Sequence, residues 1–131
     1  MNQNMKLFNE LSATILYSLF EKFPVAIEFS IEDHPDLNTI ENSDVFYDTF
    51  KFLSNENYIK FQHQVCGGFL DVTLTSKGLS VLNAIPDSLK EKEALWQSLK
   101  KALKNGSEEV LADIMKKLFA FGTNFLVGTI S

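Results

Sequence analysis

The sequence of 131 residues contains no arginine at all, although it contains twelve lysines. Arginine is the side chain that most often reads bases in the major groove of DNA, and lysine and arginine both neutralise phosphates. The absence of arginine therefore removes the commonest means of base recognition. The formal net charge of −5 further disfavours a polyanionic partner.

Cysteine and long apolar runs are also scarce. Cys66 is the single cysteine, which excludes an internal disulfide and fits the reducing environment of the cytoplasm. The longest uncharged apolar stretch, residues 118–131, has 14 residues, whereas about 20 are needed to span a bilayer. The N-terminus carries an acid at Glu10 and no basic region ahead of an apolar run, so we expect neither a signal peptide nor a membrane span.

The residues that are present are typical of a globular protein whose charge is unevenly distributed. Hydrophobic residues make up 45% of the chain and charged residues 22%, and twelve phenylalanines can fill a sizeable core. Residues 1–57 contain three lysines and ten acids, whereas residues 58–131 contain nine lysines and seven acids. The negative charge therefore belongs to the first half of the chain.

Hydrophobic periodicity predicts an α+β fold. Gly67-Gly68 suits a two-residue hairpin loop, which would place Val65 opposite Leu70 and His63 opposite Val72 on one face. Ser43, Thr75 and Ser107 are placed to cap helices, Ser88 and Glu91 have the spacing of a capping box, and Gly106 ends a helix. The expected helices are 5–22, 43–55, 75–85, 87–104 and 107–128, and the expected strands are 25–31, 58–65 and 69–74.

The stretch FYDTFKFLSNENYIKFQHQVCGGFLDVTLTSKGLSVL, residues 46–82, resembles the end of a winged-helix domain. A helix ends in Leu53 and leads through Asn57-Tyr58-Ile59 into a hairpin wing, and Leu74-Thr75-Ser76-Lys77-Gly78 then starts a helix. The MarR-like and PadR-like branches share this order. The resemblance implies a winged-helix-like domain at residues 1–85 and a C-terminal helical extension at residues 86–131. It also implies a dimeric, DNA-binding regulator, whose DNA-facing residues would be Lys51, Lys60, Gln62 and Gln64.

The charges of the expected reading helix do not suit DNA. The helix has three acids, Asp44, Asp48 and Glu56, and one lysine, Lys51. Its N-terminal end, which would point into the groove of DNA, is the acidic end. An acidic surface instead steers binding to a basic protein. We therefore expect a non-enzymatic adaptor or immunity-like inhibitor that binds a protein such as a basic toxin or nuclease; the regulator is the alternative. The expected partner-binding residues are Glu28, Glu32, Asp33, Asp36, Asp44 and Asp48.

The last expected helix has a coiled-coil-like seam, because apolar residues recur at alternating spacings of three and four. From residue 118 onward the helix is apolar on other faces too, so it must be buried under the domain, in a partner or at a membrane surface. The winged-helix resemblance favours a homodimer. The expected dimerisation residues are Leu111, Ile114, Leu118, Phe121 and Phe125.

Motifs for catalysis or for metal binding are weak. His63 and Cys66 are three residues apart and His34 lies between two acids, but a zinc site needs three or four clustered ligands. Cys66 could act as a nucleophile only beside an oriented base, and the glycine pair matches a hairpin rather than a phosphate loop. The carboxylates near Glu28 lack the glycine and the spacing of a calcium loop. We expect no metal, no cofactor and no catalytic residues.

Overall fold

The computed structural model describes residues 2–87 and 92–130, with side chains described as far as residue 124. Within these ranges it contains five α-helices, one 3-10 helix and a small antiparallel sheet of four strands, so the α+β prediction is confirmed. The helices are α1 (Gln3–Lys22), η1 (Ile31–Asp33), α2 (Ser43–Asn55), α3 (Ser76–Asn83), α4 (Leu95–Asn105) and α5 (Glu108–Ile130). The strands are β1 (Ile27–Ser30), β2 (Ile59–Lys60), β3 (His63–Val65) and β4 (Gly68–Leu74).

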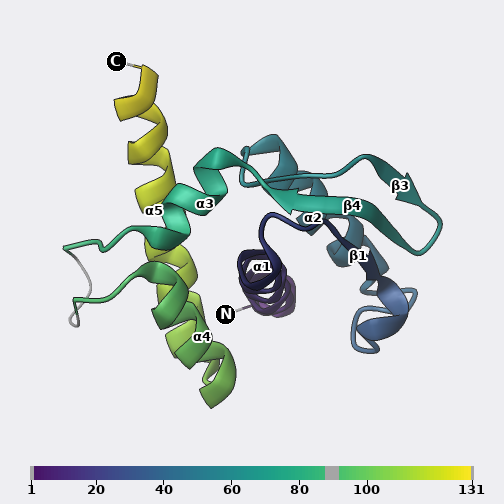
Figure 1. Cartoon of the computed structure of the whole chain (residues 1–131). Coiled ribbons are helices and arrows are strands. Elements are labelled where there is room, and N and C mark those ends of the chain that lie inside the picture. Colours follow the sequence, from purple (N-terminus) through teal and green to yellow (C-terminus); the bar gives the residue numbers. More distant parts are fainter. Residues whose placement is uncertain (1, 88–91, 131) are drawn as a thin grey trace.

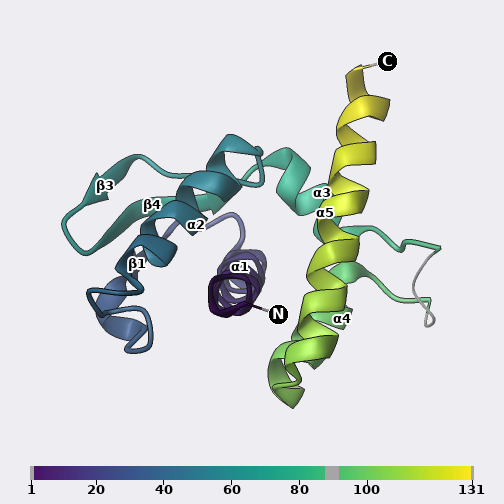
Figure 2. The same cartoon turned by 180° about the vertical axis from the view of Figure 1, so that it is seen from behind.

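Helix α1 lies at the centre of the fold. Figures 1 and 2 show it between the sheet with α2 on one side and α4 with α5 on the other. Much of its apolar surface is buried, with Ile15 and Leu16 fully covered and Leu19 at 1% exposure. One hydrophobic cluster joins α1 to the sheet, α2, α3, α4 and α5, and it therefore spans both sides of the predicted boundary at residue 85.

Strand β4 is the middle of the sheet, with β1 along one edge and with β2 and β3 in succession along the other. Ile27 pairs with Val72 and Phe29 with Phe69, so β4 contains one extra residue relative to β1. Asp71 lies in this bulge with a φ of 55°. Because the bulge interrupts the alternation of side chains, Phe69 and Val72 both face the core.

The hairpin has a different register from the predicted one. Val65 pairs with Gly68 and His63 with Leu70, so Cys66 and Gly67 form the two-residue loop, and the prediction was wrong by two residues. Gly67 supplies the turn with a φ of 87°. Gly68 is a strand residue, and a Cβ there would overlap the carbonyl oxygen of Phe29. The close approach of residue 68 to β1 therefore explains why this position is glycine. His63 and Val65 are exposed and do not belong to a covered face.

The starts of α2 and α3 follow the sequence closely. Thr75 caps α3 as predicted, because its hydroxyl accepts a hydrogen bond from the Gly78 N–H at 3.0 Å. Helix α2 begins at Ser43, and Asn42 rather than Ser43 is the cap residue. Asn42 makes no side-chain cap bond, since its amide donates to the carbonyl oxygen of Asp36 at 3.0 Å.

Helix α4 begins later than predicted, at Leu95 rather than near residue 87. The Leu95 N–H donates to the carbonyl oxygen of Ala84 at 2.8 Å, and Gln97 Oε1 accepts from the Ala94 N–H at 2.9 Å. These bonds fix the helix start beside the end of α3. The predicted capping box of Ser88 and Glu91 lies outside the described residues.

Helix α5 begins after Gly106, which adopts a φ of 67° and ends α4 as predicted. Ser107 caps α5, because its Oγ accepts a hydrogen bond from the Val110 N–H at 3.3 Å. In the part of the chain that the structure describes, no helix has both the length and the apolar character needed to cross a membrane.

Candidate protein-binding surface

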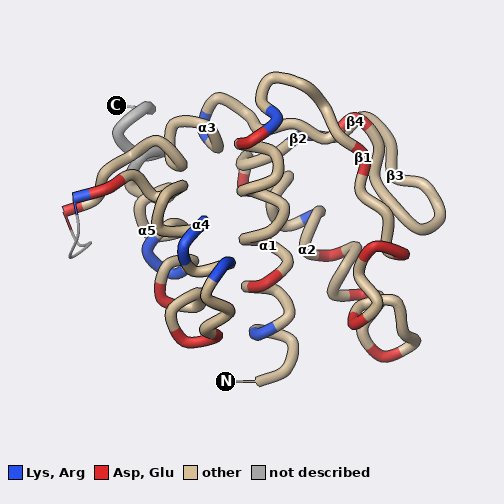
Figure 3. The backbone as a smooth tube through the Cα atoms, turned by 60° about the horizontal axis from the view of Figure 1, so that its bottom comes forward, with Lys and Arg blue, Asp and Glu red and all other residues tan. Residues whose placement is uncertain are grey.

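The predicted partner-binding carboxylates lie at one end of the molecule, which we call the acidic end and define as residues 28–48. β1 carries Glu28, η1 carries Glu32 and Asp33, the following loop carries Asp36, and α2 carries Asp44 and Asp48; all six residues are exposed. Figure 3 shows acidic residues along β1, the loop and α2, while a group of basic residues lies on α4 and α5. The fold thus brings together acids that are up to 20 residues apart in the sequence.

The acidic end is unneutralised but structurally anchored. It contains seven carboxylates, counting Glu41, and no lysine, and no ion pair joins any of the seven to another described residue. Ile31 and Leu37 are buried beneath it at 7% and 4% exposure. The Gly67 carbonyl oxygen accepts from the Ile31 N–H at 2.8 Å, which ties this end to the hairpin tip. The acids are therefore held on a defined surface.

A cavity of about 240 Å³ opens between α1 and the loop of the acidic end. Glu10 and Thr14 line it from α1, and Asp33, His34 and Asp36 line it from the loop. The His34 ring lies 5.8 Å from the Phe46 ring between centroids. Burial lowers the pKa of the His34 imidazole below its ordinary value, and the neighbouring Asp33 carboxylate opposes this shift. The lowered pKa therefore favours the neutral form of the His34 imidazole.

The residues of the DNA-binding alternative are all exposed but do not form a basic surface. Lys51 is on α2, Lys60 on β2 and Gln64 on β3, and Gln62 lies between those two strands. Lys60 and Gln62 line one cavity of about 270 Å³ together with Asp71, so the formal charges of the residues that line it balance.

Five of the nine lysines of the second half lie on α4 and α5, away from the hairpin (Figure 3). Two of them are already paired there, since Lys101 Nζ lies 2.9 Å from Glu93 Oε2 and Lys117 Nζ lies 3.0 Å from Asp113 Oδ2. A lysine stripe beside the wing, which a regulator would need, is therefore not formed by these residues.

Most of the predicted dimerisation seam is covered by the same chain. Leu111, Ile114 and Leu118 are buried at 5%, 7% and 0% exposure, where α5 packs against α1, α3 and α4. A second copy could reach these three residues only if those helices separated. Phe121 is partly exposed, and the side chain of Phe125 lies outside the described residues.

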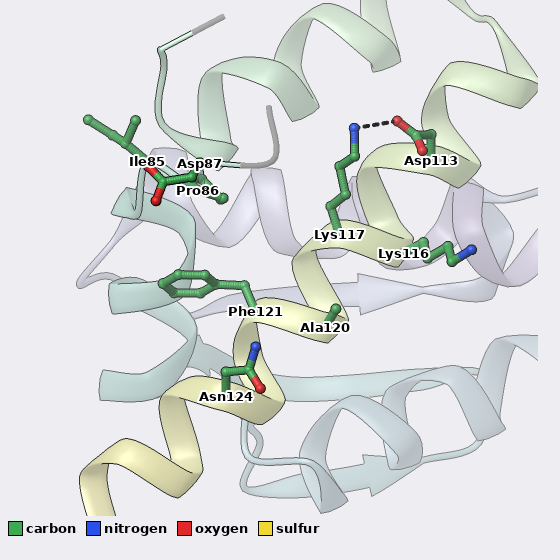
Figure 4. A pocket seen from close by; sticks show the side chains of 9 residues that line it. All are labelled: Ile85, Pro86, Asp87, Asp113, Lys116, Lys117, Ala120, Phe121 and Asn124. Carbon is green, nitrogen blue, oxygen red and sulfur yellow. Dashed lines mark ion pairs between the residues drawn. The ribbon is translucent and has the colours of Figure 1, made fainter. Parts of the chain in front are cut away.

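Another cavity, of about 590 Å³, lies at the other end of the fold, where α5 faces the segment that follows α3 (Figure 4). Two aspartates, Asp87 and Asp113, and two lysines, Lys116 and Lys117, line it. Because these charges balance, this cavity does not share the strong negative charge of the acidic end. Phe121 supplies part of its apolar wall.

The candidate catalytic and metal-binding residues are spread over the surface. His63 and Cys66 are exposed at the tip of the hairpin, whereas His34 lies in the loop after η1. Nowhere in residues 2–87 and 92–124 do three His, Cys, Asp or Glu side chains gather as metal ligands would.

Sequence reasoning missed three features of the acidic end. Glu41 belongs to the same run of acids and was omitted, although the charge pattern itself would have identified it. Ile40 is 99% exposed among these acids, and no periodic pattern predicts that exposure. Glu10 reaches the cavity only because α1 packs beside the loop. No protein-family model, curated protein or solved structure matches this chain, so its function has to be inferred from its own residues and their geometry.

Proposed function

We propose that this protein is a non-enzymatic protein-interaction module that binds a basic partner protein through its acidic end. The observation that carries the proposal is the set of seven exposed carboxylates in residues 28–48, without a lysine and without an ion pair to another described residue. Ordinary surfaces intersperse charges of both signs, whereas a surface of one sign raises the association rate with a complementary partner.

The partner we propose is a protein with a basic surface, such as a toxin or nuclease, and the module would act as its inhibitor or as an adaptor in the cytoplasm. Ile40 supports a protein partner, because a fully exposed isoleucine among acids offers an apolar contact that a simple cation could not use. Nothing in this proposal requires a cofactor or a catalytic residue. The lone thiol of Cys66 is consistent with a reducing compartment.

We further propose that residues 1–85 form a winged-helix-like domain that serves as a scaffold for protein contacts. Supporting this are the element order α1, β1, η1, α2, β2, β3, β4 and the flanking of β4 by β1 and by β2 with β3. The Thr75 cap and the hairpin of β3 and β4 also support this proposal. A fold of this kind does not decide the function by itself.

The proposal is tested by measuring the affinity for a soluble lysine–serine peptide in two charge-matched variants. The first variant carries Glu32→Gln, Asp36→Asn and Asp48→Asn in the acidic end. The control carries Glu56→Gln, Asp87→Asn and Glu109→Gln, which are exposed acids elsewhere on the surface.

Exposed ion pairs contribute about 0.2–1 kcal/mol each, so the first variant should bind the peptide roughly tenfold more weakly at low salt. The control should bind like the wild type. Equal losses in the two variants would mean that the peptide responds only to net charge, and the acidic end would not be a binding surface. Duplex DNA tested in parallel should not be retained; salt-sensitive retention would favour the regulator instead.

A further inference from the structure

A groove with an apolar floor runs between α1 and α2, on the side of α2 that carries two acids of the acidic end. Its volume is about 400 Å³. The floor and walls are mostly apolar, and the aspartates belong to the first two turns of α2. The lining residues are Asn4, Met5, Phe8, Asp44, Val45, Asp48, Thr49 and Phe52.

The apolar part of this groove is exposed although it is well packed from behind. Phe52 is 42% exposed and Met5 is 45% exposed. The rings of Phe8 and Phe52 meet edge to face at 5.4 Å, and each also contacts the ring of Phe119 on α5 at 5.8 Å. The groove thus presents a rigid aromatic floor, which is the kind of surface where the anchors of protein interfaces dock.

The charges at the groove select the kind of segment that could occupy it. Asp44 and Asp48 form no ion pair with another described residue, and Lys6 of α1 contacts Glu108 of α5 at 3.9 Å instead. A segment that buries apolar side chains here would therefore bring its flanking residues close to two free carboxylates. Lysine or arginine at those flanking positions would be attracted, and acids would be repelled.

We propose that the groove between α1 and α2 binds the apolar face of an amphipathic basic helix of the partner protein. Lysine or arginine side chains beside that face pair with Asp44 and Asp48, and apolar side chains spaced by three and four residues contact Phe52 and Val45. This inference rests on the proposed function and adds the kind of segment that the acidic end recognises. It makes the interaction depend on apolar contact as well as on charge.

The test compares three labelled peptides by fluorescence anisotropy. The first is a lysine–leucine peptide that forms an amphipathic helix, the second has serine in place of every leucine, and the third has glutamate in place of every lysine. The wild-type protein should bind the lysine–leucine peptide at least tenfold more tightly than the lysine–serine peptide, and should not bind the glutamate–leucine peptide.

The Phe52→Ala variant distinguishes the contribution of the groove to peptide binding from the contribution of the charges. The substitution should weaken lysine–leucine binding about tenfold, which corresponds to 1.4 kcal/mol, and should leave lysine–serine binding unchanged. Val110→Ala removes a comparably exposed apolar side chain from α5, at 48% exposure, and should change neither affinity. Circular dichroism checks that both variants remain folded. Asp44→Asn with Asp48→Asn should weaken both basic peptides.

The contrary outcomes are distinguishable. If both basic peptides bind equally and Phe52→Ala has no effect, the groove proposal fails while the acidic end remains a binding surface. If neither basic peptide binds, the proposed function fails and the groove proposal fails with it. If the glutamate–leucine peptide binds as tightly as the lysine–leucine peptide, the proposal that the occupant of the groove is basic is overturned. If the wild type is a dimer and Phe52→Ala converts it to a monomer, the groove is occupied by a second copy of this chain and the proposal is overturned.

Discussion

Replacing Gly78 by alanine should destabilise the protein, although alanine favours a helix more than glycine does. Gly78 is in the first turn of α3, where the backbone of α3 approaches the backbone of Tyr58. A Cβ at residue 78 would overlap the Tyr58 carbonyl oxygen and would lie 3.1 Å from its carbonyl carbon and 3.2 Å from Leu74 Cδ2. A backbone carbonyl cannot rotate away as a flexible side chain can, so α3 and β2 would have to move apart.

The movement would weaken the bonds that join α3 to the start of β2. The Thr75 N–H donates to the Tyr58 carbonyl oxygen at 3.1 Å, and the Thr75 hydroxyl donates to the carbonyl oxygen of Asn57. Overpacking of this kind costs about 1–3 kcal/mol, and the helix preference of alanine returns at most about 1 kcal/mol. Because the overlap is with a backbone atom, we expect a cost in the upper part of this range and a net loss of about 1–2 kcal/mol, or a fall in Tm of roughly 3–10 °C.

Urea unfolding followed by circular dichroism measures this loss, with Ser80→Ala as the matched control. Ser80 is exposed on α3, so its replacement changes the helix preference without adding a contact. The control should be as stable as the wild type or slightly more stable. If Gly78→Ala is as stable as Ser80→Ala, then α3 does not approach Tyr58 as closely as described, and the reasoning is refuted.

Four further results are expected. Burial raises the pKa of Tyr58 to about 12, so the neutral phenol contributes stability that is fully present below the ordinary pKa of about 10 and is lost as pH rises through the pKa of the folded state. The free energy of unfolding, measured with urea, should therefore fall more in the wild type than in Tyr58→Phe between about pH 10 and pH 12. Because the pKa of His34 is lowered in the folded protein, the unfolded chain binds a proton on this imidazole at a higher pH than the folded chain does. The free energy of unfolding should therefore fall from roughly pH 7 to pH 5, and it should fall less steeply in His34→Gln than in the wild type. Phe50 is fully buried and stacks on Phe69 at 4.3 Å, so Phe50→Ala should lower the free energy of unfolding by about 3–5 kcal/mol, and a loss below about 1 kcal/mol would contradict the core described. A homodimer through the predicted α5 seam would depend on the last residues of that seam, because Leu111, Ile114 and Leu118 are buried within the chain, so truncation after Asn124 should turn such a dimer into a monomer in light scattering, whereas a monomeric full chain would exclude the dimer.

The helices and strands were predictable where periodicity and capping agreed. Phe46, Phe50 and Leu53 fall on one stripe of α2 and are all fully buried, because spacings of three and four repeat on one helix face. Thr75 and Gly106 mark a helix start and a helix end, because their backbone geometry is set locally. In each of these cases the signal lies within a few residues.

The hairpin register was not predictable, because it depends on contacts with a distant strand. Either glycine of the pair can form a turn, and only the approach of Gly68 to the backbone of Phe29 places it in β4. The bulge at Asp71 likewise shifts the buried face from an alternating pattern to Phe69 and Val72. A single sequence does not reveal such tertiary constraints.

The candidate surface was predictable in its charge but not in its shape. The run of acids from Glu28 to Asp48 is visible in the sequence, and the fold gathers it at one end. The groove between α1 and α2 had a partial signal, since Val45 and Phe52 are seven residues apart and form a second apolar stripe on α2 beside the core stripe. Its other wall comes from α1, and only the folded chain brings the two helices together.

The most direct test of the acidic end is a map of backbone amide shifts by NMR as the lysine–leucine peptide is added to the isotopically labelled protein. We predict that the shifted amides concentrate in residues 28–48, together with the facing first turns of α1, and that added salt reduces the shifts. Shifts centred on Lys60, Gln62 and Gln64, with residues 28–48 unaffected, would contradict the proposed binding surface.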